Sequence, residues 1–293
     1  MANVHRLNDM LPEQAASPTG QASENMFGYT AVYGDVGCFS KPPAISREKL
    51  HFFHVLSPWF KFLSVTFILT VVTILVYIAT IAYNANLENV LSPRGTTLDL
   101  FGSNNAKKIS EGQVWRLFTA IFLHASGEHI LGNGFALLLI GFSIEARYGK
   151  WNFLASYLFC GIAANLFSDM FSLCASSLGA STSVMGLVGI FTGEIVYFWE
   201  HIRNKYMAAY FTVLMLFFFF IVTGFAFRNV DLGGHVGGFL NGLFLCPLLN
   251  YKDPKRPRWY KYGIGISITL IAGLLGLSSG LMWGRSHASC PSI

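Results

Sequence analysis

The sequence predicts an all-α membrane protein whose helices cross the bilayer several times. Of the 293 residues, 53% are hydrophobic and only 12% are charged, about half the charged fraction of a soluble globular chain. The mean hydropathy is +0.48, and several long stretches lack Asp, Glu, Lys and Arg. These observations exclude a disordered chain and argue against an ordinary water-soluble domain.

Seven stretches approach the roughly 20 residues that a spanning helix needs. Five of them are free of charged residues, and two are polar for membrane helices. The charge-free stretches are Phe62–Tyr83, Trp151–Ser168, Tyr206–Phe227, Leu232–Tyr251 and Tyr262–Gly284; the polar ones are His129–Arg147 and Ser181–Trp199. Five of the six tryptophans fall at the ends of these stretches, where indole rings prefer to lie.

The distribution of cations predicts the orientation. Twelve Lys and Arg residues lie before the first span or in the loops after spans two, four and six, against six on the opposite side. Cytoplasmic loops carry the excess of Lys and Arg, so the amino terminus is expected in the cytosol. Residues 1–58 are then a mostly disordered cytosolic tail, 251–261 a basic cytosolic loop, 262–284 the seventh span and 285–293 a short lumenal or extracellular tail. The first span acts as an uncleaved targeting signal.

With this orientation, spans two, four and six begin at the outer face, and each begins with polar residues. His129 and Asn133 open span two, Ser181 opens span four, and His235 is the fourth residue of span six. Polar groups within a membrane are costly and mark functional sites by default. The alternative for each residue is a structural hydrogen bond between helices.

Glycines on spans four and six predict that these two helices approach closely. Gly186, Gly189 and Gly193 lie on span four, and Gly238 and Gly242 form a small-xxx-small pair on span six. Close approach would let Ser181 share a hydrogen bond with His235. Ser181 also stands at the start of a helix, where free N–H groups and the helix dipole stabilise an oxyanion. His129 and Asn133 share a helix face and could supply further donors.

These residues resemble the motifs of the rhomboid family of intramembrane serine proteases over about residues 59–250, which include a long first loop at 84–126. Gly179-Ala180-Ser181 is similar to the Gly-x-Ser nucleophile motif, and His235 with Gly238 and Gly242 to the His-x-x-Gly-x-x-x-Gly helix. His129 and Asn133 resemble the oxyanion segment, preceded by His124. The remaining matches are Trp115-Arg116 in the first loop and Glu145-Ala146-Arg147 with Gly149 at the end of span two.

The resemblance implies a six-helix rhomboid core followed by one C-terminal transmembrane helix, an arrangement of secretory-pathway members, and weakly suggests the apicomplexan branch. It implies an endopeptidase with Ser181 as nucleophile and His235 as general base and acid. No cofactor or metal is expected. Expected partners are the lipid bilayer and single-pass membrane proteins, with cell-surface adhesins as candidate substrates, and no nucleic acid. The expected location is the Golgi, a secretory organelle or the plasma membrane.

The chain departs from the family at two positions, with Thr182 in place of glycine after the serine and Met185 in place of an aromatic residue. Ser183 is a rival nucleophile, and Asp231 could be a third catalytic member, although a helix cap is the favoured interpretation. Trp115-Arg116 is interpreted as an interfacial anchor, and Glu145 and Arg147 as packing and ion-pair residues.

Two other classes of function stay open. A non-catalytic rhomboid-like protein would be expected to lack the serine or the histidine, and both are present. A polytopic transporter would be expected to show internal repeats or charged residues along a pathway, and neither is found. The sequence also lacks the His-Glu-x-x-His motif of zinc proteases.

Overall fold

The computed structural model describes residues 61–83, 89–171, 174–201, 206, 209–210, 212–214 and 231–284. The predicted tails 1–58 and 285–293 and most of the predicted span Tyr206–Phe227 lie outside the described residues. The long helices are α2 (Val65–Tyr83), α6 (Gly127–Tyr148), α7 (Lys150–Asp169), α8 (Ser181–Tyr197), α11 (Leu232–Leu249) and α12 (Tyr260–Gly284). The shorter elements are α3 (Gly95–Leu100), β1 (Asn104–Asn105), α4 (Ala106–Ser110), α5 (Arg116–Thr119), η4 (Ala120–Phe122), β2 (Ser176–Ser177) and η5 (Trp199–His201).

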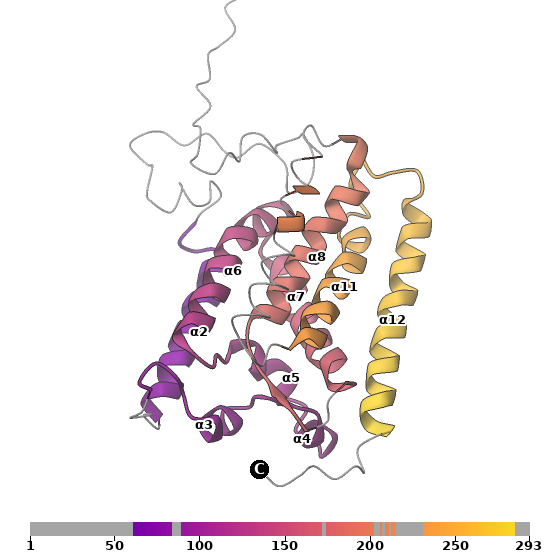
Figure 1. The fold of residues 1–293 in the computed structure, drawn as a ribbon. Coiled ribbons are helices and arrows are strands. Elements are labelled where there is room, and N and C mark those ends of the chain that lie inside the picture. Colours follow the sequence, from indigo (N-terminus) through magenta and orange to yellow (C-terminus); the bar gives the residue numbers. More distant parts are fainter. Residues whose placement is uncertain are drawn as a thin grey trace, which may run out of the picture.

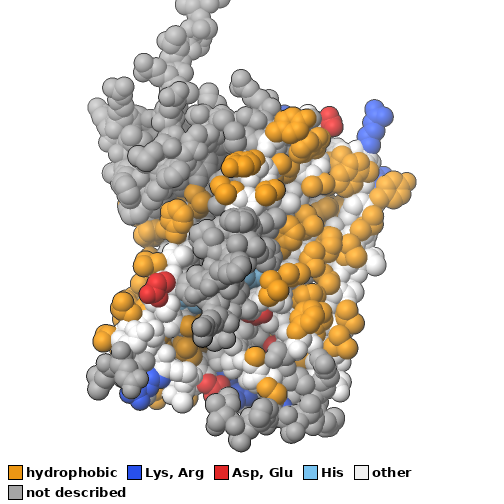
Figure 2. Space-filling view, in the orientation of Figure 1, with side chains coloured by type: hydrophobic (Ala, Val, Ile, Leu, Met, Phe, Trp, Pro, Cys, Tyr) orange, Lys and Arg blue, Asp and Glu red, His pale blue; other side chains and the backbone are white. Residues whose placement is uncertain are grey.

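The six long helices form a bundle with α8 at its centre (Figure 1). Helix α8 packs mainly against α11 and α7, while α2 packs against α6, and α12 lies outside α11 and α7. All but two of the 17 residues of α8 are buried. In the most apolar 18-residue stretch of α12, by contrast, only 11% is buried. Hydrophobic side chains cover much of the outer surface on the α12 side (Figure 2).

Six of the seven predicted spans correspond to these helices, with ends that differ by at most three residues. By length and composition, α2, α6, α11 and α12 could each cross a membrane. Helix α8 is apolar but, with 17 residues, one residue too short for that class, and α7 is 20 residues long but less apolar. Most polar residues of α7 and α8, such as Ser156, Asn165 and Glu194, are buried against protein, whereas Asn152 near the start of α7 is exposed. The total of seven spans stays a prediction.

The first loop is itself folded. Its helices α3, α4 and α5 form a layer at the end of the bundle where α6, α8 and α11 begin (Figure 1). Strand β1 of this loop pairs antiparallel with β2, with Asn104 opposite Ser177 and Asn105 opposite Ser176. Strand β2 directly precedes α8, so the loop is connected to the segment that leads into Ser181.

Candidate active site

The contact between α8 and α11 is close enough to require glycine. A methyl group at Gly242 would lie 1.9 Å from the carbonyl oxygen of Gly186, and one at Gly238 would lie 2.2 Å from the carbonyl oxygen of Thr182. Backbone atoms on both sides cannot move away cheaply, so a side chain at either position would separate the helices. The glycines therefore bring the first two turns of α8 directly against the first three turns of α11.

This packing places His235 of α11 beside the residue that follows Ser181. A methyl group at Gly234 would lie 2.9 Å from Cγ2 of Thr182, and Gly238 contacts the Thr182 carbonyl group. Thr182 thus contacts α11 at Gly234, before His235, and at Gly238, after it. His235 is 4% exposed and Ser181 is 7% exposed. The structure brings the two predicted catalytic residues onto facing helices in one buried layer.

Ser181 is the first residue of α8. Its backbone N–H has no acceptor within the helix, as is general for the first residues of a helix. The preceding chain is bent at Gly179, whose φ of +131° is a conformation that residues with side chains rarely adopt. The turn is held from the first loop, because the Gly179 N–H donates to the carbonyl oxygen of Ala120 at 2.9 Å.

His129 lies directly against this turn. A methyl group at Gly179 would be 2.9 Å from Cε1 and 3.0 Å from Nε2 of His129, and 3.5 Å from Oγ of Ser181. The absence of a side chain at Gly179 therefore leaves the space in which the imidazole and the serine hydroxyl approach one another. His129 and His235 are also close enough to interact electrostatically.

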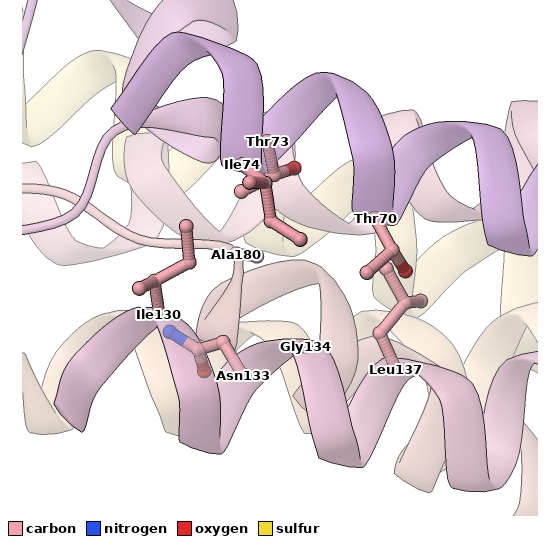
Figure 3. A pocket seen from close by; sticks show the side chains of 8 residues that line it. All are labelled: Thr70, Thr73, Ile74, Ile130, Asn133, Gly134, Leu137 and Ala180. Carbon is pink, nitrogen blue, oxygen red and sulfur yellow. The ribbon is translucent and has the colours of Figure 1, made fainter. Parts of the chain in front are cut away.

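Asn133 lies one helical turn after His129 on α6, at 5% exposure. It lines a small crevice between α2 and α6 that reaches Ala180, the residue before Ser181 (Figure 3). Its Nδ2 atom is buried and has no hydrogen-bond acceptor among the described residues. Asn133 thus carries a donor in the neighbourhood of Ser181 that no described residue accepts.

His124 holds the same segment from the loop before α6. Its Nε2 atom accepts a hydrogen bond from the Ala180 N–H at 3.4 Å, and its ring packs edge to face against His129 with centroids 4.9 Å apart. Burial, reinforced by His129, lowers the pKa of His124 to about 3. His124 is therefore neutral and can act as an acceptor.

The predicted anchor pair lies in the first loop. Arg116 is 4% exposed and donates to the carbonyl oxygens of Asp99 at 2.9 Å and Ser103 at 3.0 Å. Its guanidinium carbon lies 4.9 Å from the centroid of the Trp115 ring, and Trp115 is 46% exposed. These contacts hold the first loop together, and none of them involves Ser181.

Glu145 and Arg147 lie at the opposite end of α6 and have different partners. Glu145 accepts hydrogen bonds from the first residues of α2. Arg147 donates to Asn250 at 2.9 Å and pairs with Glu194 at 3.5 Å and with Asp253. Glu194 is fully buried in α8, so Arg147 joins α6, α8 and the loop after α11.

The alternatives to the predicted site also have defined positions. Ser183 is fully buried and packs against Gly161 of α7, where a methyl group would lie 2.1 Å from its Oγ. Asp231 caps α11, because its carboxylate accepts the Gly234 N–H at 2.7 Å. Among the described residues, no group of three His, Cys, Asp or Glu side chains could hold a metal ion.

Several contacts near the site were not expected from the sequence. The bond from Ala180 to His124 and the β1–β2 pairing join segments more than 50 residues apart, and no local pattern signals them. Asn104 donates to Asp169 at 2.7 Å and so fastens the first loop to the end of α7. Asn104 and Asp169 are 65 residues apart, so the sequence alone gives no sign that these two polar residues pair.

The fold and the arrangement of these residues correspond to the rhomboid class of membrane proteins. Residues 111–252 match the Rhomboid domain. Together with the relatives below, this match shows that the chain belongs to the rhomboid family, an intramembrane protease family, and is a multi-pass membrane protein.

Two relatives match over nearly the whole chain. Rhomboid-like protease 2 of Toxoplasma gondii is 32% identical over 268 residues, which are 89% of this chain and 90% of the relative. Rhomboid-like protease 1 of the same organism is 33% identical over 282 residues, 94% of this chain and 92% of the relative. Rhomboid protease GluP of Bacillus subtilis is 33% identical over 154 residues, 52% of this chain and 29% of the relative. The chain is thus similar to apicomplexan members along most of its length.

Proposed function

We propose that this chain is an active serine endopeptidase that cuts single-span membrane proteins near the outer or lumenal edge of their transmembrane helix. The observation that carries the proposal is the arrangement around Gly179, where the His129 ring and the Ser181 hydroxyl converge on a site that cannot hold a side chain. The relatives named rhomboid-like proteases support the same activity.

The chemistry requires a dyad of Ser181 and His235. His235 takes the proton from Ser181 Oγ as this oxygen attacks the substrate carbonyl carbon, and it later gives the proton to the leaving amine. Water then attacks the acyl-enzyme, with His235 again as base, and releases the second product. Close packing of α8 on α11 supports this pairing because it holds the two helices at fixed separation.

The negative charge that develops on the carbonyl oxygen needs donors. The Ser181 N–H, His129 and the unused Nδ2 of Asn133 are the candidates, and one such donor is worth about 2.7–4 kcal/mol. Thr182 and Met185 lie on the α8 side of the contact with α11. The two departures from the family pattern at these positions therefore affect the position of the His235 side chain.

The substrate preference follows from the cost of unwinding a helix in lipid. Each unsatisfied peptide group there costs several kcal/mol, so a Leu-rich span should resist entry. Substrates should have an outer or lumenal amino terminus and Gly, Ala or Ser near the outer third of the span, where helix propensity is weaker or side chains are small. Cell-surface adhesins with such spans are candidate substrates, in the Golgi, a secretory organelle or the plasma membrane.

The direct test is cleavage of a labelled single-span peptide by the detergent-solubilised full chain, with the cut mapped by mass spectrometry. Ser181→Ala and His235→Ala should each abolish cleavage with nearly unchanged melting temperatures, and the double variant should be no slower than either single variant. Ser183→Ala is the matched control and should stay active. Full activity in Ser181→Ala would reject the serine-protease assignment.

A second arm tests recognition with the enzyme unchanged. Replacing the small residues of a cut span by leucine should block cleavage, and placing them in an uncut span should create a substrate. If a uniform Leu span were cut equally fast, the enzyme would have to recognise a region of the substrate outside the membrane.

A further inference from the structure

Asp231 occupies the N-cap of α11, and its carboxylate is fixed from two helices. One oxygen, Oδ1, accepts the Gly234 N–H at 2.7 Å and the hydroxyl of Ser168 on α7 at 2.5 Å. Two donors to one carboxylate oxygen hold the group in place and offset the cost of removing a charge from water.

The second oxygen of this carboxylate is unused. Oδ2 is buried and has no hydrogen-bond donor among the described residues, so helix capping accounts for only half of the group. A methyl group at Gly234 would lie 2.6 Å from this Oδ2 and 2.9 Å from Cγ2 of Thr182. Glycine at 234 therefore leaves room for the carboxylate beside the residue that follows the nucleophile.

The carboxylate also lies near the predicted base. His235 follows Asp231 by four residues, and its N–H donates to the Asp231 carbonyl oxygen at 3.0 Å, as in a regular first turn. Asp231 is the N-cap residue just outside the helix, and its carboxylate binds the N–H of Gly234, the residue before His235. The half-buried Asp231 is close enough for its charge to act on the His235 ring, and because His235 is only 4% exposed, water screens this interaction less than it would at the surface.

We propose that Asp231 is a positioning residue for catalysis as well as a helix cap: its fixed negative charge stabilises the imidazolium that His235 becomes when it holds the proton of Ser181. This inference rests on the proposed Ser181–His235 dyad. It goes beyond that dyad because the carboxylate acts through space and touches neither the substrate nor the reacting atoms.

The test separates the charge of Asp231 from its capping role. Asp231→Asn keeps a side-chain oxygen that can accept both the Gly234 N–H and the Ser168 hydroxyl, since Asn caps helices as well as Asp, and it removes only the charge. Asp231→Ala removes both charge and cap. Glu128→Gln is the charge control, because Glu128 is an exposed carboxylate in the first turn of α6, next to His129. Full-length variants are compared by kcat, KM and melting temperature with the labelled peptide.

Asp231→Asn should lower kcat about tenfold, the order expected for a half-buried charge near the base, with KM and melting temperature close to wild type. Asp231→Ala should lower both kcat and melting temperature, and Glu128→Gln should leave kcat within about twofold of wild type. Wild-type kcat in Asp231→Asn would mean that Asp231 is only a helix cap, and an equal loss in Glu128→Gln would replace the specific role by a general charge effect; either result overturns the inference alone. A wild-type chain that cuts no single-span peptide would instead overturn the proposed function and this inference together.

Discussion

Glu145 on α6 and Thr66 on α2 are joined by two hydrogen bonds to one carboxylate oxygen. Oε2 of Glu145 accepts the Thr66 backbone N–H at 2.8 Å and the Thr66 hydroxyl at 2.8 Å, while Oε1 accepts the Val65 N–H at 2.9 Å. Glu145 therefore serves as the N-terminal cap of a helix 80 residues earlier in the chain, where free N–H groups favour a negative charge.

Glu145→Ala should lower the melting temperature clearly, because it removes the acceptor of the buried Thr66 N–H and of the partly buried Val65 N–H, at about 1–3 kcal/mol for a buried unsatisfied group. Thr66→Val is the control that removes only the hydroxyl bond and keeps the shape packed against Gly141, so its loss should be about 1 kcal/mol. Thermal unfolding in detergent measures both. Equal losses in the two variants would contradict the capping role.

Asn133→Ala should lower kcat by about 10²–10³ if its unused Nδ2 binds the oxyanion. The melting temperature should change little, since that nitrogen has no acceptor among the described residues. Asn152→Ala, at an exposed position on α7 where the amide donates to Tyr148, is the matched control and should stay active. His129→Ala should slow turnover in the same way. Unchanged kcat in a folded Asn133→Ala sample would assign Asn133 to helix packing.

His124 should make stability depend on pH. Its folded-state pKa, about 3, lies below the unfolded value of about 6.5, so the unfolded chain binds the proton more readily. The stabilisation is complete above pH 6.5 and is lost as the pH falls from there toward 3. His124→Gln, whose Oε1 can accept the Ala180 N–H, should lose less melting temperature than wild type between pH 7 and pH 5. Parallel pH curves would show that His124 does not contribute.

Gly242→Ala should disrupt the bundle, because the added methyl group meets the Gly186 carbonyl oxygen at 1.9 Å. Overpacking of this kind typically costs about 1–3 kcal/mol, and it should lower cleavage by separating α8 from α11. Gly265→Ala on α12, where a methyl group meets nothing within 4 Å, is the matched control. A Gly242→Ala variant as stable and active as Gly265→Ala would mean that the helices do not need this contact.

Reporter tags in residues 1–58 and in the loop 251–261 should be cytosolic, and a tag in residues 285–293 should be lumenal or extracellular. Protease protection in sealed vesicles measures this orientation. The physical basis is the excess of Lys and Arg on the predicted cytosolic side. A cytosolic carboxyl terminus would show that the number of spans is even.

The sequence by itself determined the class of protein and the helix positions. Low charge and long apolar runs define membrane helices through the cost of backbone and charge in lipid, which depends on composition and length alone. The glycines of α8 and α11 likewise indicated a close helix contact, because small residues at helical spacing are a local pattern. The motifs around Ser181 and His235 gave the candidate site, whose catalytic roles stay predictions.

Only the tertiary structure decided which distant groups support that site and which join the helices of the bundle. The Ala180 bond to His124, the β1–β2 pairing and the capping of α2 by Glu145 join segments 50 to 80 residues apart, and each partner alone is an ordinary polar residue. The same holds for Asp231: its cap is predictable from the sequence, but a second carboxylate oxygen that is buried without a donor among the described residues is not. Buried polar groups must find partners wherever the fold brings them, so these pairings depend on the packing of whole helices and loops, which a local sequence pattern does not encode.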